Sequence, residues 1–202
     1  MGFAENRPVW ETHYARERSR QEVPDENVVR YLHRFLRENQ KRPLRALDLG
    51  SGSGRNLNYI RSLPIEAYGC DFSFNALRGQ QNVCCSIASE LPFKDSSFDL
   101  VIVWGVLHYL PEDLVNNTLR EILRVLKPGG KLLATLRSSD DTHLAGTLER
   151  GDLTGGQARL FTQAEAKRLL GDFSDLRFGY ISRVPLGESG VVAHHVIEGT
   201  RG

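Results

Sequence analysis

The sequence predicts an α/β protein built on a mostly parallel sheet. Short apolar runs alternate with segments of helical period along most of the chain. The run at residues 44–49 leads into a turn with three alternating glycines, after which apolar residues resume at helical spacing. Residues 100–103 are apolar without alternation, which is typical of a parallel strand covered on both faces. At 202 residues the chain is most simply one domain with a sizeable core.

Composition limits the classes of partner. The formal net charge of +1 gives no indication of nucleic acid binding. The longest apolar run, residues 100–110, is too short to cross a bilayer, and the N-terminus lacks the pattern of a secretion signal. The three cysteines are odd in number and lack Cys-x-x-Cys spacing, which fits a reducing cytosol. We therefore expect a cytoplasmic protein that acts on a small molecule, with neither nucleic acid nor membrane as partner.

The glycine-rich turn is the chief candidate for a ligand site. Glycine accepts positive φ and lets a ligand approach the main chain closely. The helix that follows offers unpaired N–H groups and a partial positive charge, and Asp48 adds a carboxylate where the strand ends. A nicotinamide dinucleotide site requires Gly-x-Gly-x-x-Gly, whereas Arg55 stands at the place of the third glycine. A dehydrogenase is therefore disfavoured.

A second strand is predicted at residues 65–71, after a helix that stops before Pro64. This strand ends on Asp71, about twenty residues beyond the glycines, where an acidic side chain can accept both hydroxyl groups of a ribose. Phe72 comes next and is placed to lie against a flat base. Acids are common at strand ends, so Asp71 is a candidate ligand-binding residue mainly because it follows the glycine turn. Ser73 is predicted to cap a short helix.

Further elements complete the predicted order. A third strand is expected at residues 83–88, and a strand at 131–136 follows the Pro-Gly-Gly turn that ends at Gly130. Thr162 and Glu165 form a capping box that begins a helix. The last two predicted strands, at residues 176–184 and 191–198, are joined by a turn and form a β-hairpin.

Two polar segments lie outside this pattern. Residues 1–42 predict an N-terminal helical cap, in which Asp25 begins the second helix and Trp10 and Tyr14 lie at helical spacing in the first. Residues 137–160 lack a sustained apolar period, and so long a connection is either functional or poorly ordered. We expect residues 1–24 and 137–160 to form a lid over the ligand. The alternative is that both remain mobile surface segments.

Three motifs at compatible spacing resemble those of class I methyltransferases that use S-adenosylmethionine. The stretch Asp48-Leu-Gly-Ser-Gly-Ser-Gly54 resembles motif I of that family. Leu-Pro-Phe at 91–93, Ser-Phe-Asp at 97–99 and Gly-Val-Leu-His at 105–108 resemble a large group that includes ubiquinone-pathway enzymes. The third match is Ile-Leu-Arg-Val-Leu-Lys-Pro-Gly-Gly at residues 122–130. Together the motifs cover roughly residues 44–136.

The resemblance implies a single-domain, Rossmann-like class I methyltransferase fold. Its seven-stranded sheet would have helices on both faces, a cofactor-binding core at residues 43–136, and a C-terminal helix and antiparallel β-hairpin at 161–202. The cofactor would be S-adenosylmethionine and the product S-adenosylhomocysteine. On this basis we expect cofactor binding by Tyr14, Asp48, Gly50, Ser51, Gly52, Asn56, Asp71, Phe72, Ala88, Ser89, Trp104 and Gly105. Tyr14 is assigned to the methionine end of the cofactor, on the strength of the expected lid.

This chain departs from its relatives just before Leu-Pro-Phe. There they often have Asp-Ala-Glu, with the Asp on the adenine amino group, whereas this chain has Ile87-Ala88-Ser89. The main chain of Ala88 and Ser89 is left to reach the adenine edge. The loss motivates an alternative function, a catalytically silent methyltransferase-like subunit that binds the cofactor or a partner. Asp48 and Asp71, both present, argue against this alternative.

Methyl transfer requires alignment more than a fixed set of catalytic groups. His108 follows the fourth strand, on the side where acceptors bind, and is our candidate general base; the alternative is a residue that merely starts a helix. His143 in the long loop presents the same two possibilities. His194 and His195 lie on the last strand with no Asp, Glu or Cys cluster at metal spacing, so we interpret them as structural and expect no metal.

Overall fold

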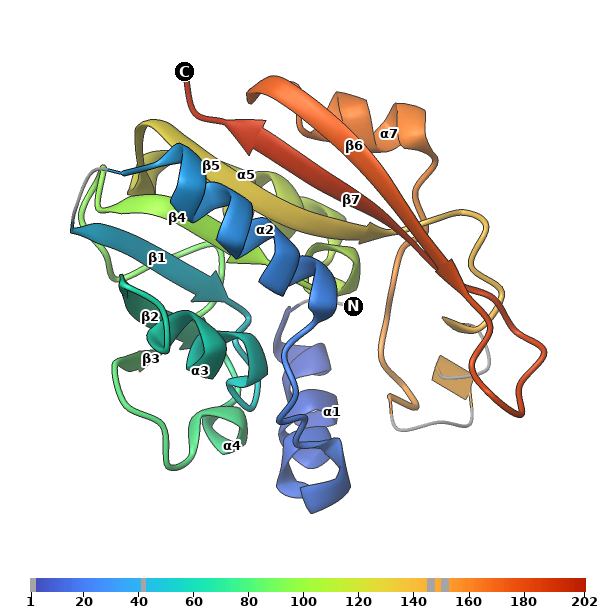
Figure 1. The fold of residues 1–202 in the computed structure, drawn as a ribbon. Coiled ribbons are helices and arrows are strands. Elements are labelled where there is room, and N and C mark those ends of the chain that lie inside the picture. Colours follow the sequence, from blue (N-terminus) through green and yellow to red (C-terminus); the bar gives the residue numbers. More distant parts are fainter. Residues whose placement is uncertain (1–2, 41–42, 145–147, 150–152) are drawn as a thin grey trace.

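The computed structural model describes residues 3–40, 43–144, 148–149 and 153–202. Within them, seven strands form one sheet in the order β3-β2-β1-β4-β5-β7-β6 (Figure 1). In chain order the strands are β1 (Leu44–Leu49), β2 (Ile65–Asp71), β3 (Val83–Cys85), β4 (Phe98–Val103), β5 (Leu126–Arg137), β6 (Ser174–Arg183) and β7 (Val192–Thr200). Strands β1 to β5 pair in parallel, and β7 lies antiparallel between β5 and β6. The predicted parallel sheet with a C-terminal antiparallel hairpin is confirmed.

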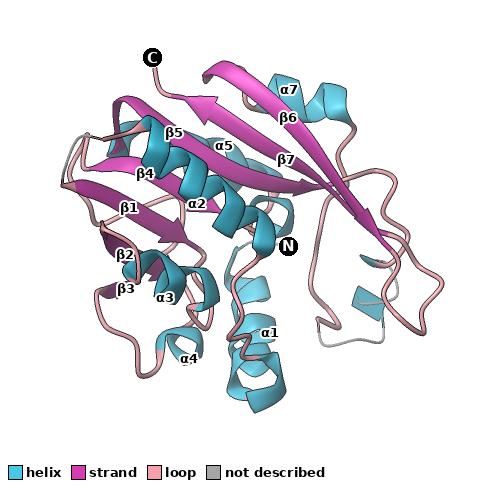
Figure 2. Ribbon diagram, viewed as in Figure 1, coloured by secondary structure: helices cyan, strands magenta, loops and turns pink. Residues whose placement is uncertain are grey.

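Helices cover both faces of the sheet, as predicted (Figure 2). The helices are α1 (Phe3–Ala15), α2 (Glu26–Glu38), α3 (Arg55–Arg61), α4 (Phe74–Leu77), α5 (Glu112–Val125) and α7 (Gln163–Leu169), with single 3-10 turns η1 (Glu17–Ser19) and η2 (Leu107–Tyr109). Leu32 of α2 and Ile60 of α3 pack in one core cluster with Ile102 of β4. Ile122 of α5 packs in the other cluster with Val101, because successive strand residues point to opposite faces.

The predicted helix starts are present. The Asp25 side chain accepts a hydrogen bond from Asn27 N at 3.0 Å, and Ser73 Oγ accepts one from Ala76 N at 3.2 Å. Thr162 and Glu165 form the capping box of α7. Each start satisfies N–H groups that a helix leaves unpaired in its first turn.

Two strand boundaries differ from prediction. The third strand was expected to reach residue 88, but β3 ends at Cys85, because Ser86 Oγ bonds to Glu90 O and the chain turns. The fifth was expected to start at residue 131, but β5 starts at Leu126 and carries its Pro-Gly-Gly segment as an irregularity in the pairing with β4. The C-terminal Arg201 exchanges main-chain hydrogen bonds with this glycine pair, which keeps the segment in the sheet.

Parallel pairing brings the C-terminal ends of β1, β2, β4 and β5 to one edge of the sheet. Helix α1 lies against this edge, and the chain after β5 leaves from it (Figure 1). In the predicted lid of residues 137–160, positions 145–147 and 150–152 lie outside the described residues. Asp141 holds the described start of that segment on β7, since its Oδ2 accepts a hydrogen bond from Ala193 N at 2.8 Å. Among the helices described, none is long and apolar enough to cross a membrane.

Candidate cofactor and acceptor site

The turn after β1 is shaped by three glycines in the left-handed region. Gly50, Gly52 and Gly54 have φ values of 72°, 53° and 89°, a conformation in which a side chain is costly. All three also lie directly against other side chains, Gly54 against that of Gln80. A Cβ at Gly50 would be 2.2 Å from Val106 Cγ2, and one at Gly52 would be 2.5 Å from Tyr14 Oη. The turn therefore requires glycine both for its conformation and for its close packing.

Asp71 joins this turn to the end of β2. Its Oδ2 accepts a hydrogen bond from Gly52 N at 2.9 Å, and its Oδ1 accepts one from Ser73 N at 2.9 Å. Burial raises the pKa of Asp71 to about 6, although main-chain hydrogen bonds from Ser73, Gly52 and Phe72 favour the ionised form. A carboxylate oxygen has two lone pairs, so each oxygen can accept a second hydrogen bond. The side chain can therefore receive two hydroxyl groups without releasing the turn.

Asp48 lies beneath the turn. The residue is only 2% exposed. Burial raises the pKa of Asp48 to about 7, and the nearby charge of Arg55 opposes the rise. Of the groups described in this structure, none forms a hydrogen bond with Asp48 Oδ2. Two cavities lie beside the turn; Gly50 lines both and Leu49 one of them, whereas Asp48 lines neither. Its expected contribution to a ligand thus acts through the main chain above it.

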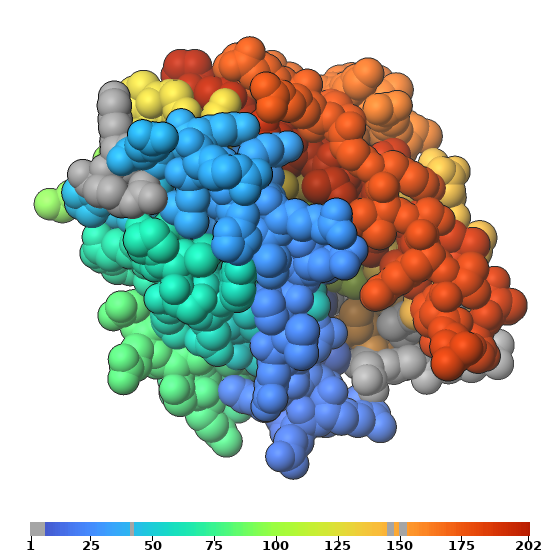
Figure 3. Space-filling model, viewed as in Figure 1, coloured from blue at the N-terminus to red at the C-terminus, as the bar shows by residue number. Residues whose placement is uncertain are grey.

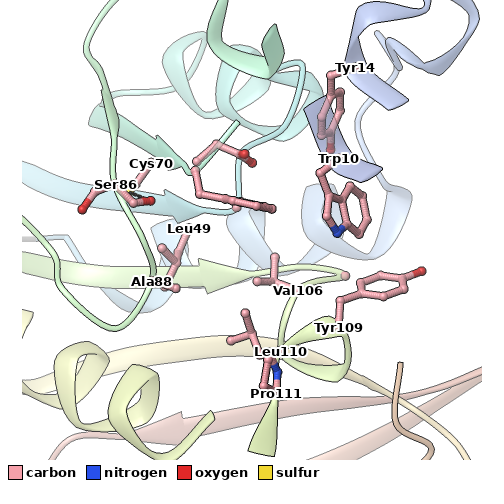
Figure 4. A pocket seen from close by; sticks show the side chains of 14 residues that line it. Trp10, Tyr14, Leu49, Cys70, Ser86, Ala88, Val106, Tyr109, Leu110 and Pro111 are labelled. Atoms are coloured by element: carbon pink, nitrogen blue, oxygen red, sulfur yellow. Dashed lines mark hydrogen bonds between the residues drawn. The ribbon is translucent and has the colours of Figure 1, made fainter. Parts of the chain in front are cut away.

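An apolar cavity of about 650 Å³, measured with its open mouth, lies beside the turn (Figure 4). Its lining consists of Trp10, Tyr14, Leu49, Gly50, Cys70, Asp71, Phe72, Ser86, Ala88, Gly105, Val106, Tyr109, Leu110 and Pro111. Asp71 supplies a carboxylate to an otherwise largely apolar wall, which is the chemistry that suits a nucleoside. Ser86 lines this cavity beside Ala88, whereas the predicted Ser89 is not part of the lining.

A larger and more polar cavity adjoins the first. The two share Trp10, Tyr14, Gly50, Gly105 and Tyr109. The Trp10 ring packs edge-on against Tyr109, with centroids 5.0 Å apart, and stacks on Tyr14 with centroids 6.0 Å apart. These three aromatic side chains, named here the aromatic wall, lie between the apolar cavity and the polar one.

The remaining predicted cofactor residues line the polar cavity. Ser51, Gly52, Asn56 and Trp104 all belong to its lining. Asn56 Oδ1 accepts a hydrogen bond from Asp25 N at 3.0 Å, so this residue also ties the start of α3 to the start of α2. Ser51 Oγ is buried and, within the described part of the chain, has no hydrogen-bond partner. An unpaired buried hydroxyl is costly in a folded protein and is commonly satisfied by a bound group.

His108, the candidate base, is buried in the wall of the polar cavity. Burial, with added repulsion from His194 and Arg137, holds its pKa well below the ordinary value. Burial and Arg137 likewise lower the pKa of His194 to about 4. The two rings lie 5.8 Å apart, and Arg137 Nη1 is 3.3 Å from His194 Nε2. The polar cavity thus presents two neutral imidazoles beside a guanidinium at neutral pH.

A buried ion pair holds the guanidinium in place. Arg137 Nε is 2.6 Å from Asp141 Oδ2, and the Asp141 side chain is fully buried. Main-chain N–H groups of His143, Leu144 and Ala193 also donate to this carboxylate. These three donors satisfy the carboxylate, which offsets part of the cost of burying it beside the guanidinium.

The other histidines have separate partners. His143 lines the polar cavity and contacts Glu188, with Nε2 and Oε2 2.5 Å apart. His195 Nε2 lies 2.9 Å from Phe161 O, as a structural histidine would. His194 was also interpreted as structural, yet it lines the cavity beside His108. Across the described ranges, no group of three or more His, Cys, Asp or Glu side chains is arranged to hold a metal ion.

Several lining residues were not anticipated from the sequence. Ser86, Val106, Tyr109 and Arg137 were not singled out as site residues, although all four line one or both cavities. Val106 and Tyr109 lie in the Gly-Val-Leu-His segment or next to it, so that motif was a usable signal. Arg137 reaches the site because it pairs with His194 across β5 and β7, and this long-range pairing leaves no local mark in the sequence.

A glycine turn, an acid at the end of the next strand and this strand order together define a class I methyltransferase domain. Residues 47–134 match the methyltransferase domain family. The match covers a little under half of the chain, and the fold is that of the class I methyltransferases that use S-adenosylmethionine.

Named relatives agree with this assignment. The demethylmenaquinone methyltransferase of Lactiplantibacillus plantarum is 39% identical over 113 residues, which cover 48% of this chain and 47% of that protein. The phthiotriol/phenolphthiotriol dimycocerosates methyltransferase 1 of Mycobacterium ulcerans is 29% identical over 153 residues, or 70% of this chain and 54% of that protein. This chain therefore aligns with about half of the length of each relative.

The fold is also that of a solved structure. The 1,6-didemethyltoxoflavin-N1-methyltransferase of Burkholderia thailandensis, solved with S-adenosylhomocysteine, superposes with a TM-score of 0.69 at 20% identity. That match covers 96% of this chain and 84% of the other chain. Identity this low supports the fold alone.

Proposed function

We propose that this protein is a methyltransferase that transfers the methyl group of S-adenosylmethionine to a hydrophilic small molecule. The observation that carries the proposal is the meeting of the two cavities at the aromatic wall. An apolar cavity with Asp71 lies on one side, and a polar cavity with His108 lies on the other. A cofactor that spans the aromatic wall would present its methyl group to the polar side.

The residues present fit the cofactor. The Asp71 carboxylate faces the apolar cavity and can accept the ribose hydroxyls, and Phe72 and Ala88 offer apolar surface to an adenine. Ser51 lies in the turn that would pass under the methionine part, and Tyr14 lies above Gly52 in the same place. Gly50, Gly52, Asn56, Trp104 and Gly105 are proposed to complete this part of the site, with Asp48 supporting the turn from below.

The remaining work of this chain is alignment and proton handling. When bound, S-adenosylmethionine supplies a sulfonium methyl group for in-line displacement. Alignment of reacting groups can lower a barrier by ~7–11 kcal/mol, and the rigid ends of β4 and β5 provide the frame for it. His108 is neutral at physiological pH and is proposed as a general base that takes the proton of an O–H or N–H acceptor. Its lowered pKa makes it a weak base, so we place that proton transfer late, when methylation has made the acceptor acidic.

The acceptor class follows from the polar cavity. His108, His194, Arg137 and Ser182 line it together with the His143–Glu188 pair. An apolar slot would favour a lipid-like or aromatic acceptor, whereas these groups favour an acceptor with several hydrogen-bonding groups. A hydrophilic metabolite meets this requirement, and no membrane or nucleic acid is invoked.

Calorimetric titration of the purified protein tests the first half of the proposal. S-adenosylmethionine and S-adenosylhomocysteine should each bind at one site per chain, and NAD(H) should not bind. If neither S-adenosylmethionine nor S-adenosylhomocysteine bound, the proposal would be contradicted.

Turnover tests the second half of the proposal. S-adenosylhomocysteine should form when the polar small-molecule fraction of a cell extract is added, and not when an extracted lipid fraction or an RNA fraction is added instead. Cofactor binding without turnover in any fraction would favour the catalytically silent subunit.

A further inference from the structure

Helix α1 is fastened to the loop after β2 by one carboxylate. Glu11 Oε2 accepts hydrogen bonds from Ser73 Oγ at 2.9 Å and Asn75 N at 3.1 Å, and Glu11 Oε1 accepts one from Phe74 N at 2.9 Å. Partial burial opposes ionisation of Glu11, but the hydrogen bonds from Asn75 and Phe74 hold its pKa below the ordinary value. The carboxylate is therefore charged at neutral pH and makes three charge-assisted hydrogen bonds.

The fastened loop continues directly from the proposed ribose and adenine contacts. Ser73 N donates to Asp71 Oδ1, so Glu11, Ser73 and Asp71 form one chain of hydrogen bonds. The main chain takes part as well, because Asn75 Nδ2 donates to Glu11 O at 3.1 Å. A shift of α1 away from the loop would thus disturb the carboxylate on which the proposed ribose contact depends.

The same helix carries two of the three side chains of the aromatic wall. Trp10 and Tyr14 flank Glu11 on α1, and Trp10 reaches across to Tyr109 after β4. In the space-filling view, the N-terminal part of the chain lies beside the segments around residue 80 (Figure 3). A ligand that occupies both cavities passes beside these rings, since both rings line both cavities.

We propose that Glu11 is a positioning residue that latches α1 over the bound cofactor, and that its release from Ser73, Phe74 and Asn75 is the step that lets the cofactor leave. This inference rests on the proposed function. The Glu11 side chain keeps 25% of its surface exposed. Water can therefore replace its three hydrogen-bond partners. The latch can then open in each catalytic cycle while the domain stays folded.

A purely structural role for Glu11 makes different predictions. Ser73 already caps α4, since its Oγ accepts a hydrogen bond from Ala76 N. The strands of the sheet pair with one another without any contribution from α1. Loss of a structural contact would lower the stability of the cofactor-free protein. Loss of a latch would instead shorten the lifetime of the complex. Dissociation kinetics separate the two.

The experiment is stopped-flow fluorescence of the full chain with S-adenosylhomocysteine, because both tryptophans, Trp10 and Trp104, line the polar cavity. Glu11→Ala should raise the dissociation rate constant by about tenfold, an amount equivalent to one charge-assisted hydrogen bond of ~1.4 kcal/mol. Glu11→Gln keeps one acceptor oxygen and should lie between Glu11→Ala and the wild type. Glu17→Gln is the matched control, since Glu17 is exposed in η1 and should leave the rate unchanged.

Two outcomes would overturn the latch. Wild-type dissociation rates in both Glu11 variants would do so, and so would a loss of melting temperature in the cofactor-free variants with no change in rate. Glu11→Gln is nearly isosteric, which keeps the test decisive if Glu11→Ala does not fold. Hydrogen exchange should agree, with α1 exchanging faster in the S-adenosylhomocysteine complex of Glu11→Ala than in that of the wild type. No binding by the wild type would contradict the proposed function itself, a result distinct from binding with unchanged rates.

Discussion

Gly52 N donates a hydrogen bond of 2.9 Å to Asp71 Oδ2, which links the turn after β1 to the end of β2. The contact spans 19 residues of sequence and is buried. Through this bond, strands β1 and β2 present the main chain of the glycine turn and a carboxylate to the same cavity. The carboxylate is at once part of the scaffold and the proposed contact for a ribose.

Asp71→Asn should weaken cofactor binding. The amide keeps one acceptor oxygen but presents an NH₂ group where the second oxygen stood, so one ribose hydroxyl or Gly52 N loses its acceptor. The expected loss is about 1.5–3 kcal/mol of binding free energy, measured by calorimetric titration with S-adenosylhomocysteine. Asp113→Asn, at an exposed position on α5, is the control. Equal dissociation constants for Asp71→Asn and the wild type would show that Asp71 serves the fold alone.

Asp48 should make the stability of the cofactor-free protein depend on pH. Its folded pKa of about 7 lies above the ordinary value of 3.8, so the folded state binds a proton that the unfolded state does not. Stability from this group therefore rises as pH falls from 8 to 6, by ~1.4 kcal/mol. Asp48→Asn removes this term. The variant should gain stability relative to the wild type at pH 8, and that advantage should shrink toward pH 6 in urea unfolding. A pH-independent difference would show that Asp48 does not titrate in this window.

His108→Asn should slow methyl transfer without changing cofactor affinity. A positioned general base contributes typically 10²–10⁴-fold, so we expect a loss of kcat of about this size. Because burial holds the His108 pKa well below 6.5, wild-type kcat at saturating cofactor should not fall as pH drops through 6.5. Full activity of the variant would leave His108 as a structural residue.

Asp141→Ala should be strongly destabilising because it leaves Arg137 buried without its partner. Loss of one member of a buried pair costs about 3–5 kcal/mol, measured here as the free energy of unfolding in urea. The double variant Arg137→Met/Asp141→Ala should cost less than the sum of the single changes, since no buried charge then remains unpaired. Additive effects would contradict the coupling that the 2.6 Å separation indicates.

Local signals in the sequence account for much of the fold and part of the site. The bounds of β2 and the position of Asp71 follow from an apolar run that ends on an acid. Asp25 and Thr162 each come directly before the helix that they were predicted to cap. The Pro-Gly-Gly segment misled the prediction because its glycines suit a turn. Pairing with Arg201, about seventy residues away, instead holds it in β5.

The parts of the site that sequence reasoning missed depend on distant contacts. Arg137 and His194 meet only because β7 inserts antiparallel beside β5, and the histidine then faces the cavity. Glu11 contacts residues more than sixty positions further along the chain. No hydrophobic period, motif or neighbouring residue in the sequence indicates either contact.

The three cysteines differ in their access to the cavity. Cys70 is buried in the cavity lining, Cys84 is its partner in register on β3, and Cys85 is exposed. Alkylating reagents should therefore label Cys85 first and Cys70 last. A nucleoside in the apolar cavity would protect Cys70 without shielding Cys85. The thiols thus form a built-in chemical footprint, read by mass spectrometry, that distinguishes occupancy of this cavity from occupancy of the polar one.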